Sequence, residues 1–433
     1  MIRWIYQGII RDKTRSLFAF LVITAGVSMM IFFLGFMDGI FAGMVDMTAN
    51  LDTGHVRFVN RPFYEEEYMS PMDRALAAEK EMLRWLEENA DPRIRWSARI
   101  RWAAIMDVPD DRGETLHQTP VLGMAMDLLS ADSPELERLK LADSLLAGRL
   151  PEAPRELLAG HQLAETLNLE LGRPVTLLGQ SFDGGLAVDN YTVVGFVKFG
   201  VAAMDKKMAL IDIADAQDTF YMQDMVTDWL GYLPAEVDYR DYPEIQARLQ
   251  ERLPELMAHP PAAWAGDDDP MVLSILDQRN FSSLVRTFET VKKIVVGIFL
   301  FLMTLVLWNA GLLNGIHRYG EMGLRLALGE THRALVFRLG VEAFMIGVLG
   351  SLAGCLIGGV IVYYLQEVGI NMGDAFAKTG LMLSDVVRGR LSLQGFIMGI
   401  VPGMTASVLG SLIASLAVFK RSEATLFREL EAG

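Results

Sequence analysis

The chain has 433 residues, of which 52% are hydrophobic and 21% charged, and its formal net charge is −15. This acidic balance argues against a nucleic-acid-binding protein, which needs a basic surface. The single cysteine, Cys355, excludes a fold held by disulfides. High apolar content beside many acids indicates two kinds of region joined in one chain.

Four apolar runs are long enough to cross a bilayer, which takes about 20 residues. They cover residues 16–41, 294–316, 335–364 and 393–419. Between the first and second runs, residues 43–279 carry 42 acidic and 22 basic side chains, a net charge of −20. The remaining 12 acidic and 17 basic side chains give +5, so an acidic domain interrupts a mildly basic membrane scaffold.

The sequence therefore predicts an α-helical membrane protein with four transmembrane helices and a large α/β extracytoplasmic domain inserted between helices one and two. Residues 1–42 would form an amphipathic elbow on the inner leaflet and the first helix, because Ile2, Ile5 and Ile9 share one helical face. Residues 43–285 would form the extracytoplasmic domain. Residues 286–433 would form the remaining membrane part, with the other three helices.

Basic residues flank the spans on one side of the membrane, which the positive-inside rule assigns to the cytoplasm. Both termini are therefore expected in the cytoplasm. Lys292 and Lys293 oppose this rule locally, and Asp38 is a costly acid near the outer end of the first helix. The three clusters are Arg3, Arg11, Lys13 and Arg15; Arg318, Arg325, Arg333 and Arg338; and Lys420, Arg421 and Arg428.

Within the inserted domain, hydrophobic periodicity predicts mixed α/β structure. Residues 94–108 alternate arginines with Trp96, Ile100 and Trp102, as a half-buried strand does. Strands are also expected at 175–180, 191–199 and 208–213, and helices at 156–169, 214–222 and 243–257. Residues 260–269 are expected to form a loop before a final helix.

Residues 317–359 form the most informative segment. A short charged stretch, with Arg318, Glu321, Met322, Gly323, Arg325, Ala327, Leu328 and Gly329, runs into an apolar helix. That helix carries Gly350, Gly354 and Gly358, a small-xxx-small spacing that lets membrane helices pack closely. Stretch and helix together resemble the cytoplasmic coupling helix and third membrane helix of FtsX-like ABC transporter permeases.

The inserted domain carries a second resemblance, to the extracytoplasmic domains of lipoprotein-releasing and macrolide-efflux permeases. Segments 60–73 and 220–233 match no pattern of these families. The motif residues that carry the resemblance are Leu163, Ala164, Leu167, Leu169, Gly172 and Val175, then Val194, Gly195 and Phe196, then Gly200 and Asp205.

The sequence contains no catalytic or nucleotide-binding motif. It has no G-x-x-x-x-G-K-[ST] phosphate loop and no G-x-S-x-G elbow, and its six histidines do not have the spacing of a zinc site. A transporter subunit that is not itself an enzyme and holds no cofactor or metal is therefore expected. ATP and Mg would be bound by a partner ATPase.

The resemblance implies the permease subunit of a mechanotransmission-type ABC transporter in the bacterial inner membrane. Its partners would be an ABC ATPase dimer, a second permease copy or paralogue and membrane lipids. A periplasmic lipoprotein carrier or a membrane-fusion adaptor is a further possible partner. Extraction of lipoprotein or lipid from the outer leaflet is the favoured function. The alternatives are tripartite efflux of small amphiphiles, or mechanical signalling to an extracytoplasmic partner without transport.

Two groups of residues follow from this resemblance as site predictions. A coupling helix over residues 318–330 would dock in the ATPase through Arg318, Glu321, Met322, Gly323, Arg325, Leu328 and Gly329. A lateral gate for the cargo would lie between the outer ends of the first two helices, with large apolar side chains that repack around an acyl chain. Its residues would be Met37, Ile40, Phe41 and Met44, facing Ile294, Ile298, Phe301 and Leu305.

Overall fold

The computed structural model describes residues 13–110, 112–130, 133–234, 237–264, 268–278, 281–317, 324, 328–371 and 386–419. The chain divides into two compact units. The membrane unit comprises Met1–Phe41, Arg286–Ile370 and Val386–Gly433, and the outer domain comprises Ala42–Val285 and Asn371–Asp385. The predicted elbow, residues 1–12, lies outside the described residues.

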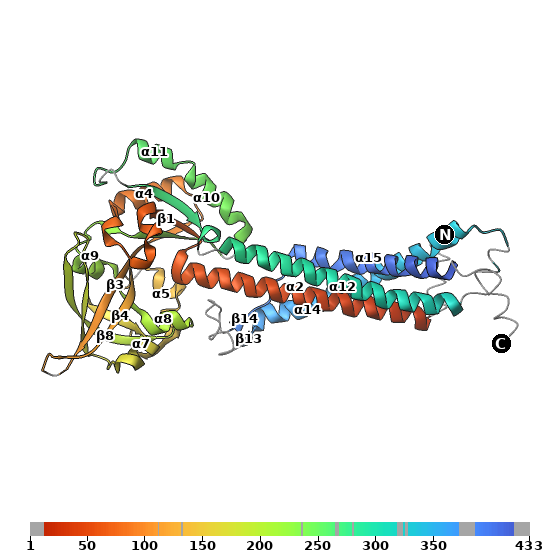
Figure 1. The fold of residues 1–433 in the computed structure, drawn as a ribbon, viewed down its shortest axis with the longest axis horizontal. Coiled ribbons are helices and arrows are strands. Elements are labelled where there is room, and N and C mark those ends of the chain that lie inside the picture. Colours follow the sequence, from red (N-terminus) through yellow and green to blue (C-terminus); the bar gives the residue numbers. More distant parts are fainter. Residues whose placement is uncertain are drawn as a thin grey trace. The chain divides into compact units, whose positions relative to one another are not determined.

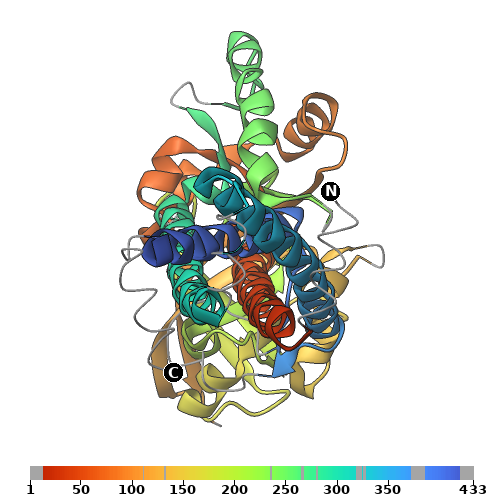
Figure 2. The same cartoon turned by 90° about the vertical axis from the view of Figure 1, so that its right-hand side faces the viewer.

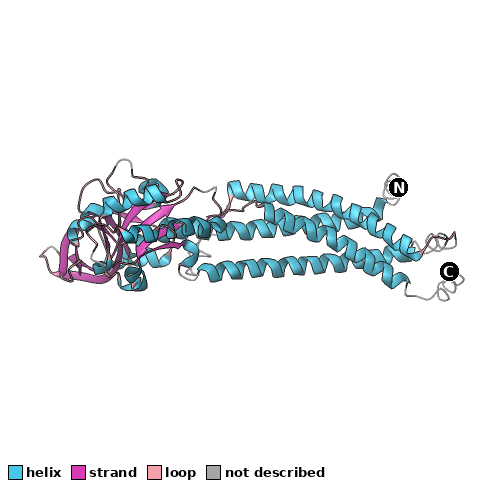
Figure 3. Ribbon diagram, turned by 90° about the horizontal axis from the view of Figure 1, so that it is seen from above, coloured by secondary structure: helices cyan, strands magenta, loops and turns pink. Residues whose placement is uncertain are grey.

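Four long helices have the length and composition to cross a membrane. They are α2 (Lys13–Thr48), α12 (Phe281–His317), α14 (His332–Val368) and α15 (Leu393–Phe419). Figure 3 shows them in cyan as a bundle of long helices. The helices α2 and α12 extend beyond the apolar runs 16–41 and 294–316, because the polar residues at their outer ends remain helical although they fall outside a hydropathy count.

Figure 2 views the membrane unit nearly along its helix axes, with α2 (red) between α12 (teal) and α14 (blue). Apolar residues from all four helices meet in one buried cluster. Its buried members are Ile23, Val27, Ile31, Met303, Leu307, Val362 and Ala406.

The outer domain is built on a ten-stranded sheet, part of which closes on itself. Strand β3 (Arg95–Pro109) pairs with β4 (Thr115–Met126), which pairs with β9 (Met208–Asp212). The ring continues through β6 (Glu156–Gly160) and β8 (Leu186–Val197) to β7 (Pro174–Gln180). Because β7 also pairs with β3, these strands form a small closed barrel (Figure 1).

The barrel interior holds a large apolar core. Trp102 on β3 is fully buried, and its partner in the register on β4 is Gly123. A Cβ atom at position 123 would lie 1.8 Å from the Trp102 ring, so only glycine leaves room for the indole. Met106, Val175 and Tyr191 complete this part of the core. Such alternation of inward and outward residues is the strand pattern that the sequence predicted for 94–108.

The other end of β3 joins a second, open part of the sheet. There β11 (Asp228–Tyr232) pairs with Arg95–Arg99 of β3, β1 (Val56–Asn60) pairs with β11, and β12 (Pro270–Ser274) forms the edge. The first membrane helix enters this region through a short π-helical turn, η1 (Ala49–Thr53), directly before β1.

Three expectations for the outer domain were wrong in detail. Residues 156–160 form strand β6 rather than helix, because the strand lies between β8 and β9 and all five side chains are buried. The helix expected over 243–257 is two helices, α10 (Tyr242–Gln250) and α11 (Leu253–Ala258). Pro254 explains the break, since proline lacks the N–H that would continue the first helix. Strand β12, not a helix, follows the acidic loop.

Smaller elements complete the fold. The remaining helices are α3 (Arg61–Glu65), η2 (Glu67–Met69), η3 (Met72–Arg74), α4 (Glu79–Asn89), α5 (Glu135–Arg138), α6 (Leu141–Ser144), α7 (His161–Leu167), α8 (Ala202–Lys207), α9 (Ile213–Thr219), η4 (Tyr239–Asp241) and η5 (Ile275–Asp277). The remaining strands are β2 (Leu76–Ala77), β5 (Leu145–Gly148), β10 (Met225–Val226), β13 (Ile370–Asn371) and β14 (Val386–Val387).

Candidate functional site

The structure describes only the end of the predicted coupling helix. Leu328 donates its backbone N–H to Leu324 O at 3.0 Å, and its side chain is 79% exposed. Gly329 follows with φ +92°, a conformation that favours glycine at the end of a helical turn. Thr331 then caps α14 by accepting from Ala334 N. Arg318, Glu321, Met322, Gly323 and Arg325 lie outside the described residues.

The three glycines of α14 lie against α2. A Cβ atom at Gly354 would be 2.7 Å from Thr24 O, and one at Gly358 would be 2.8 Å from Ser28 O. A Cβ atom at Gly350 would be 2.9 Å from Ile23 Cγ2. The helix backbones are therefore too close for any larger residue at these positions, as in other small-residue helix contacts.

The predicted gate residues do not meet within one chain. On α2, Phe41 is buried against Phe288 of α12, with ring centroids 5.0 Å apart, and Met37 and Ile40 are half-buried. Met44, also buried, belongs to the outer domain. On α12, Ile294, Ile298, Phe301 and Leu305 are 43–65% exposed.

The rotation of α12 explains this arrangement. The face of α12 that contacts α2 carries Lys292 and Met303, which are 5% exposed. These two positions are eleven residues apart, which is three helical turns and therefore one face. The predicted gate residues of α12 lie on another face. Lysine in an apolar helix was the available sequence signal, because a charge in a membrane span turns toward a partner in the protein.

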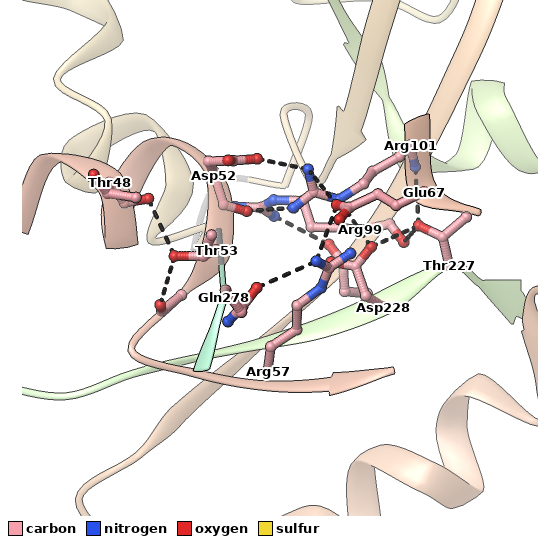
Figure 4. Close-up of polar contacts among 12 residues, drawn as sticks. Thr48, Asp52, Thr53, Arg57, Glu67, Arg99, Arg101, Thr227, Asp228 and Gln278 are labelled. Atoms are coloured by element: carbon pink, nitrogen blue, oxygen red, sulfur yellow. Dashed lines mark hydrogen bonds and ion pairs between the residues drawn. The ribbon is translucent and has the colours of Figure 1, made fainter. Parts of the chain in front are cut away.

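A cluster of charged side chains, which sequence reasoning missed, lies inside the open part of the outer-domain sheet (Figure 4). We call it the arginine cluster. It contains four arginines and four carboxylates. Its members are Arg57, Arg99, Arg101 and Arg138 with Asp52, Glu67, Glu135 and Asp228.

Asp228 on β11 is the centre of the arginine cluster and is fully buried. Its Oδ1 lies 3.4 Å from Arg57 Nε, and its Oδ2 lies 3.1 Å from Arg101 Nε. Thr227 Oγ1 donates to the same Oδ2 at 2.9 Å. Burial opposes ionisation, but the two arginines outweigh it and lower the pKa of the Asp228 carboxyl.

The segments that continue from the membrane helices also reach the arginine cluster. Asp52 in η1, just after α2, accepts from Arg101 Nη1 at 2.6 Å through Oδ1 and from Arg101 Nη2 through its carbonyl. Gln278, shortly before α12, accepts from Arg57 Nη1 at 3.3 Å. Arg101 and Arg57 both pair with Asp228, so the segments that adjoin α2 and α12 connect to one buried carboxylate.

The two segments that match no family pattern both contribute to this cluster. Segment 60–73 supplies Glu67, whose Oε1 lies 3.0 Å from Arg57 Nη1 and 3.5 Å from Arg101 Nη1. Segment 220–233 supplies Asp228 and Tyr232, and the guanidinium of Arg138 lies 3.3 Å from the centre of the Tyr232 ring. Their unusual composition therefore has a structural role in this protein.

The arginine cluster is not a metal site. Its carboxylates are paired with arginines, which occupy the positions that a cation would need. Across the part of the chain that the structure describes, no group of three or more His, Cys, Asp or Glu side chains could hold a metal ion. What the cluster can do is hold η1, β1, β3 and β11 together as one stiff region.

Four membrane-spanning helices and a large α/β domain define a membrane protein with an extracytoplasmic domain. Residues 16–252 match the MacB-like periplasmic core domain, which is more than half of the chain, and residues 293–422 match the FtsX-like permease C-terminal family. The chain belongs to the FtsX/MacB-type family of ABC transporter permeases. It is thus a permease-type membrane protein with a periplasmic core domain.

Individual relatives are distant. The chain is 23% identical over 256 residues to the lipoprotein-releasing system transmembrane protein LolC of Neisseria meningitidis, covering 55% of this chain and 58% of that protein. The chain thus spans little more than half the length of this relative. The crystal structure of the periplasmic region of MacB from Actinobacillus actinomycetemcomitans matches 56% of this chain and 95% of its own, at 12% identity and a TM-score of 0.35. A TM-score this low supports no argument about the fold.

Proposed function

We propose that this permease subunit extracts lipoprotein or lipid from the outer leaflet of the inner membrane. The energy comes from a separate ATPase dimer on the cytoplasmic side, where both termini of the chain lie. ATP binding moves the membrane helices, and that movement passes to the outer domain. The cargo enters laterally from the leaflet and does not cross the membrane.

The unequal covering of the four spans is the observation that carries this proposal. Only 11% of the second span is buried within the chain, against 33–39% of each of the others. Its exposed face presents Ile294, Ile298, Phe301 and Leu305. Because so little of α12 is buried within one chain, this helix is suited to contact a second permease copy and an acyl chain that lies between the two copies. The gate residues Met37 and Ile40, which are half-buried within one chain, would then face α12 of the other copy.

The relative from Neisseria meningitidis favours a lipid-anchored cargo, because its name assigns it to a lipoprotein-releasing system. This point concerns the class of cargo.

A photo-crosslinker at Ile298 tests the proposed cargo path. In membranes that contain the ATPase partner, we expect it to capture lipoprotein or lipid, and we expect ATP to reduce the yield. Leu356 on α14 is a matched control, since its side chain is also apolar and is 72% exposed. A crosslinker at Leu356 should capture bulk lipid with no dependence on nucleotide.

The outcomes separate the candidate functions. Capture of a small amphiphile instead of lipoprotein would support efflux. Capture of only protein neighbours, unaffected by ATP, would support mechanical signalling and would rule out the lateral path.

Coupling to the ATPase through segment 318–330 has its own test. Replacement of Glu321 by lysine or Gly323 by a bulky residue should uncouple ATP hydrolysis from cargo release and leave membrane insertion intact. Full release by these variants, with normal stimulation of the ATPase, would contradict the coupling role.

Orientation is tested with a reporter that is active only in the periplasm. A fusion after Gly231 should be active and a fusion after Gly329 silent. The reverse pattern would place the outer domain in the cytoplasm and end the proposal.

A further inference from the structure

The membrane unit contains a buried charged contact between α2 and α12. Lys292 of α12 has a side chain that is only 6% exposed. Its Nζ lies 3.0 Å from Asp38 Oδ1 on α2 and 2.7 Å from Glu289 Oε1, one turn earlier on α12. The contact lies near the outer ends of the two helices, the ends that continue into the outer domain.

A third helix joins this contact through the residue before its first turn. Ser392, directly before α15, donates from Oγ to Asp38 Oδ2 at 2.9 Å. The same Oγ accepts the N–H of Gly395 in the first turn of α15 at 3.0 Å. Asp38 therefore receives one hydrogen bond from α12 and one from the start of α15.

Glycines of α2 allow the segment that precedes α15 to pack closely against α2. Arg390 donates its backbone N–H to Gly35 O at 2.9 Å. A Cβ atom at Gly39 would lie 1.9 Å from Arg388 O, so no other residue fits there without moving this backbone. The position of Ser392 beside Asp38 is therefore set by the packing of main chain against main chain.

Beyond Lys292 toward the inner end, the next described residues of α12 are less covered within one chain. None of the residues from 293 to 302 is buried. The next buried contact toward the inner end is Met303, whose Sδ would lie 2.7 Å from a Cβ atom at Gly26 of α2. On the other side of Lys292, the ring of Phe288 packs on Phe41. Between these two apolar contacts, Lys292 and Asp38 supply a charged one.

We propose that Asp38, Lys292 and Ser392 form an ionic latch that holds the outer ends of α2, α12 and the start of α15 together and opens when cargo enters or leaves. The inference rests on the proposed function for what the opening admits, and on the bundle alone for the latch itself. A buried charge without a counter-charge is costly. The closed arrangement is therefore favoured over any state in which Lys292 has no carboxylate partner.

Glu289 makes the latch reversible. It lies on the same helix as Lys292 and moves with it, so Lys292 keeps a carboxylate when α12 leaves α2. Asp38 likewise keeps the hydroxyl of Ser392. Each charge thus retains one partner in the open state, which lowers the free-energy cost of opening relative to a simple pair.

Crosslinking between α2 and α12 tests the latch directly. In a Cys355→Ala background, the pair Phe41→Cys and Phe288→Cys reports the outer ends of the two helices, and the pair Gly26→Cys and Met303→Cys reports their middle. With a short bifunctional thiol reagent, Lys292→Met should remove most of the outer crosslink and leave the middle one unchanged. Lys292→Arg should restore the outer crosslink.

Lys293→Met is the matched control, because Lys293 is the exposed neighbour of Lys292 on the same helix. It should leave both crosslinks unchanged. An outer crosslink that survives both Lys292→Met and Asp38→Asn would overturn the latch, whatever the cargo proves to be. If Lys292→Met disturbs the middle pair as well, Asp38→Asn decides the question. This isosteric variant should lower the outer crosslink alone, and an unchanged yield would count against the proposal.

A release assay separates the latch from the proposed function. Chains locked by the outer crosslink should hydrolyse ATP with their partner and release no lipoprotein, and reduction of a disulfide at the same pair should restore release. A chain whose latch behaves as expected in crosslinking but which never releases lipoprotein would keep the latch and contradict the proposed cargo.

Discussion

The membrane bundle and the outer domain use buried charge in different ways. The described part of the bundle holds its helices mainly by close backbone contact at small residues, with Asp38 and Lys292 as a local polar contact. The outer domain instead buries a set of four arginines and four carboxylates whose formal charges cancel. Close backbone packing holds the bundle, whereas this part of the domain resists any change that separates its charges.

The arginine cluster makes one part of the outer domain rigid. A buried network in which every charge has a partner is stiff, because every partial opening leaves a charge without a counter-charge in a region of low dielectric constant. Asp52 and Gln278 connect the segments next to α2 and α12 to that network. The arginine cluster thus lies in the part of the outer domain that the chain reaches first from either helix.

The largest expected effect comes from removing the centre of the arginine cluster. Asp228→Ala would leave Arg57 and Arg101 without their shared carboxylate, at a cost of about 3–5 kcal/mol to the stability of this region. Hydrogen exchange of the β11 and β3 amides in the full chain should become correspondingly faster. Asp143→Ala, at an exposed position, is the control. Unchanged β11 protection would mean that the cluster does not stiffen the sheet.

Histidine 55 should make the same region sensitive to acid. Burial, with a smaller effect of Arg138, lowers the pKa of His55 from 6.5 to about 4. The folded domain keeps His55 neutral, since Nδ1 accepts Leu233 N at 3.1 Å. The unfolded chain takes up a proton below about pH 6.5, so stability is lost as the pH falls from about 6.5 to about 4. At about 1.36 kcal/mol per pKa unit, the loss approaches about 3 kcal/mol.

A variant isolates the contribution of His55 from the other titrating groups. His55→Asn offers a side-chain oxygen to Leu233 N and does not titrate. Thermal unfolding of both proteins across this pH range should show a shallower acid loss for the variant. Parallel curves would show that His55 takes up its proton without disturbing the fold.

A smaller effect is expected at the glycine contact of the bundle. Gly354→Ala would place a Cβ atom 2.7 Å from Thr24 O and force α2 and α14 apart, at a cost of about 1–3 kcal/mol. Gly340→Ala on the same helix meets nothing within 4 Å and should be neutral or stabilising by up to about 1 kcal/mol. The difference in thermal stability in detergent between the two variants measures the contact. Equal stabilities would show that α14 is not packed on α2 as described.

The sequence predicted more of the membrane bundle than of the arginine cluster in the outer domain. The reasons for this difference are physical. Long apolar runs and a repeated glycine spacing are local patterns, and they sufficed to predict the four spans and a close-packing face on α14. The orientation of α12 about its own axis was not predicted, because a hydropathy average does not record the helix face on which a residue lies. Lys292, treated as a topological charge, in fact identifies the face of α12 that contacts α2.

The arginine cluster was beyond such reasoning because its members come from distant segments. Arg99 and Arg101 alternate with Trp96, Ile100 and Trp102, a pattern that indicated a polar outer face for β3. Both arginines are instead buried, since β11, η1 and α5 supply carboxylates and a hydroxyl to them on that face. No spacing along the chain relates Asp52, Glu67, Glu135 and Asp228, so only the tertiary fold reveals the pairing.

The smallest expected effect concerns the edge of the outer-domain sheet. Strand β12 pairs only with β1, and at Val272 its outward backbone groups bond to side chains of α10. Gln246 Nε2 donates to Val272 O at 2.8 Å, and Val272 N donates to Gln250 Oε1 at 3.1 Å. An exposed edge invites pairing with another chain, and these two glutamines occupy the groups that such pairing needs.

Replacing both glutamines with alanine should therefore have two consequences. Each lost hydrogen bond should cost about 0.5–1.5 kcal/mol, and the freed edge should raise the tendency of the chain to self-associate. Arg248→Ala, an exposed position between them on α10, removes a charge and leaves both bonds in place. Light scattering after mild heating should show more association for the double variant than for Arg248→Ala. Equal association would mean that α10 covers the edge by its position alone, so that the outer domain depends less on its polar contacts than the arginine cluster suggests.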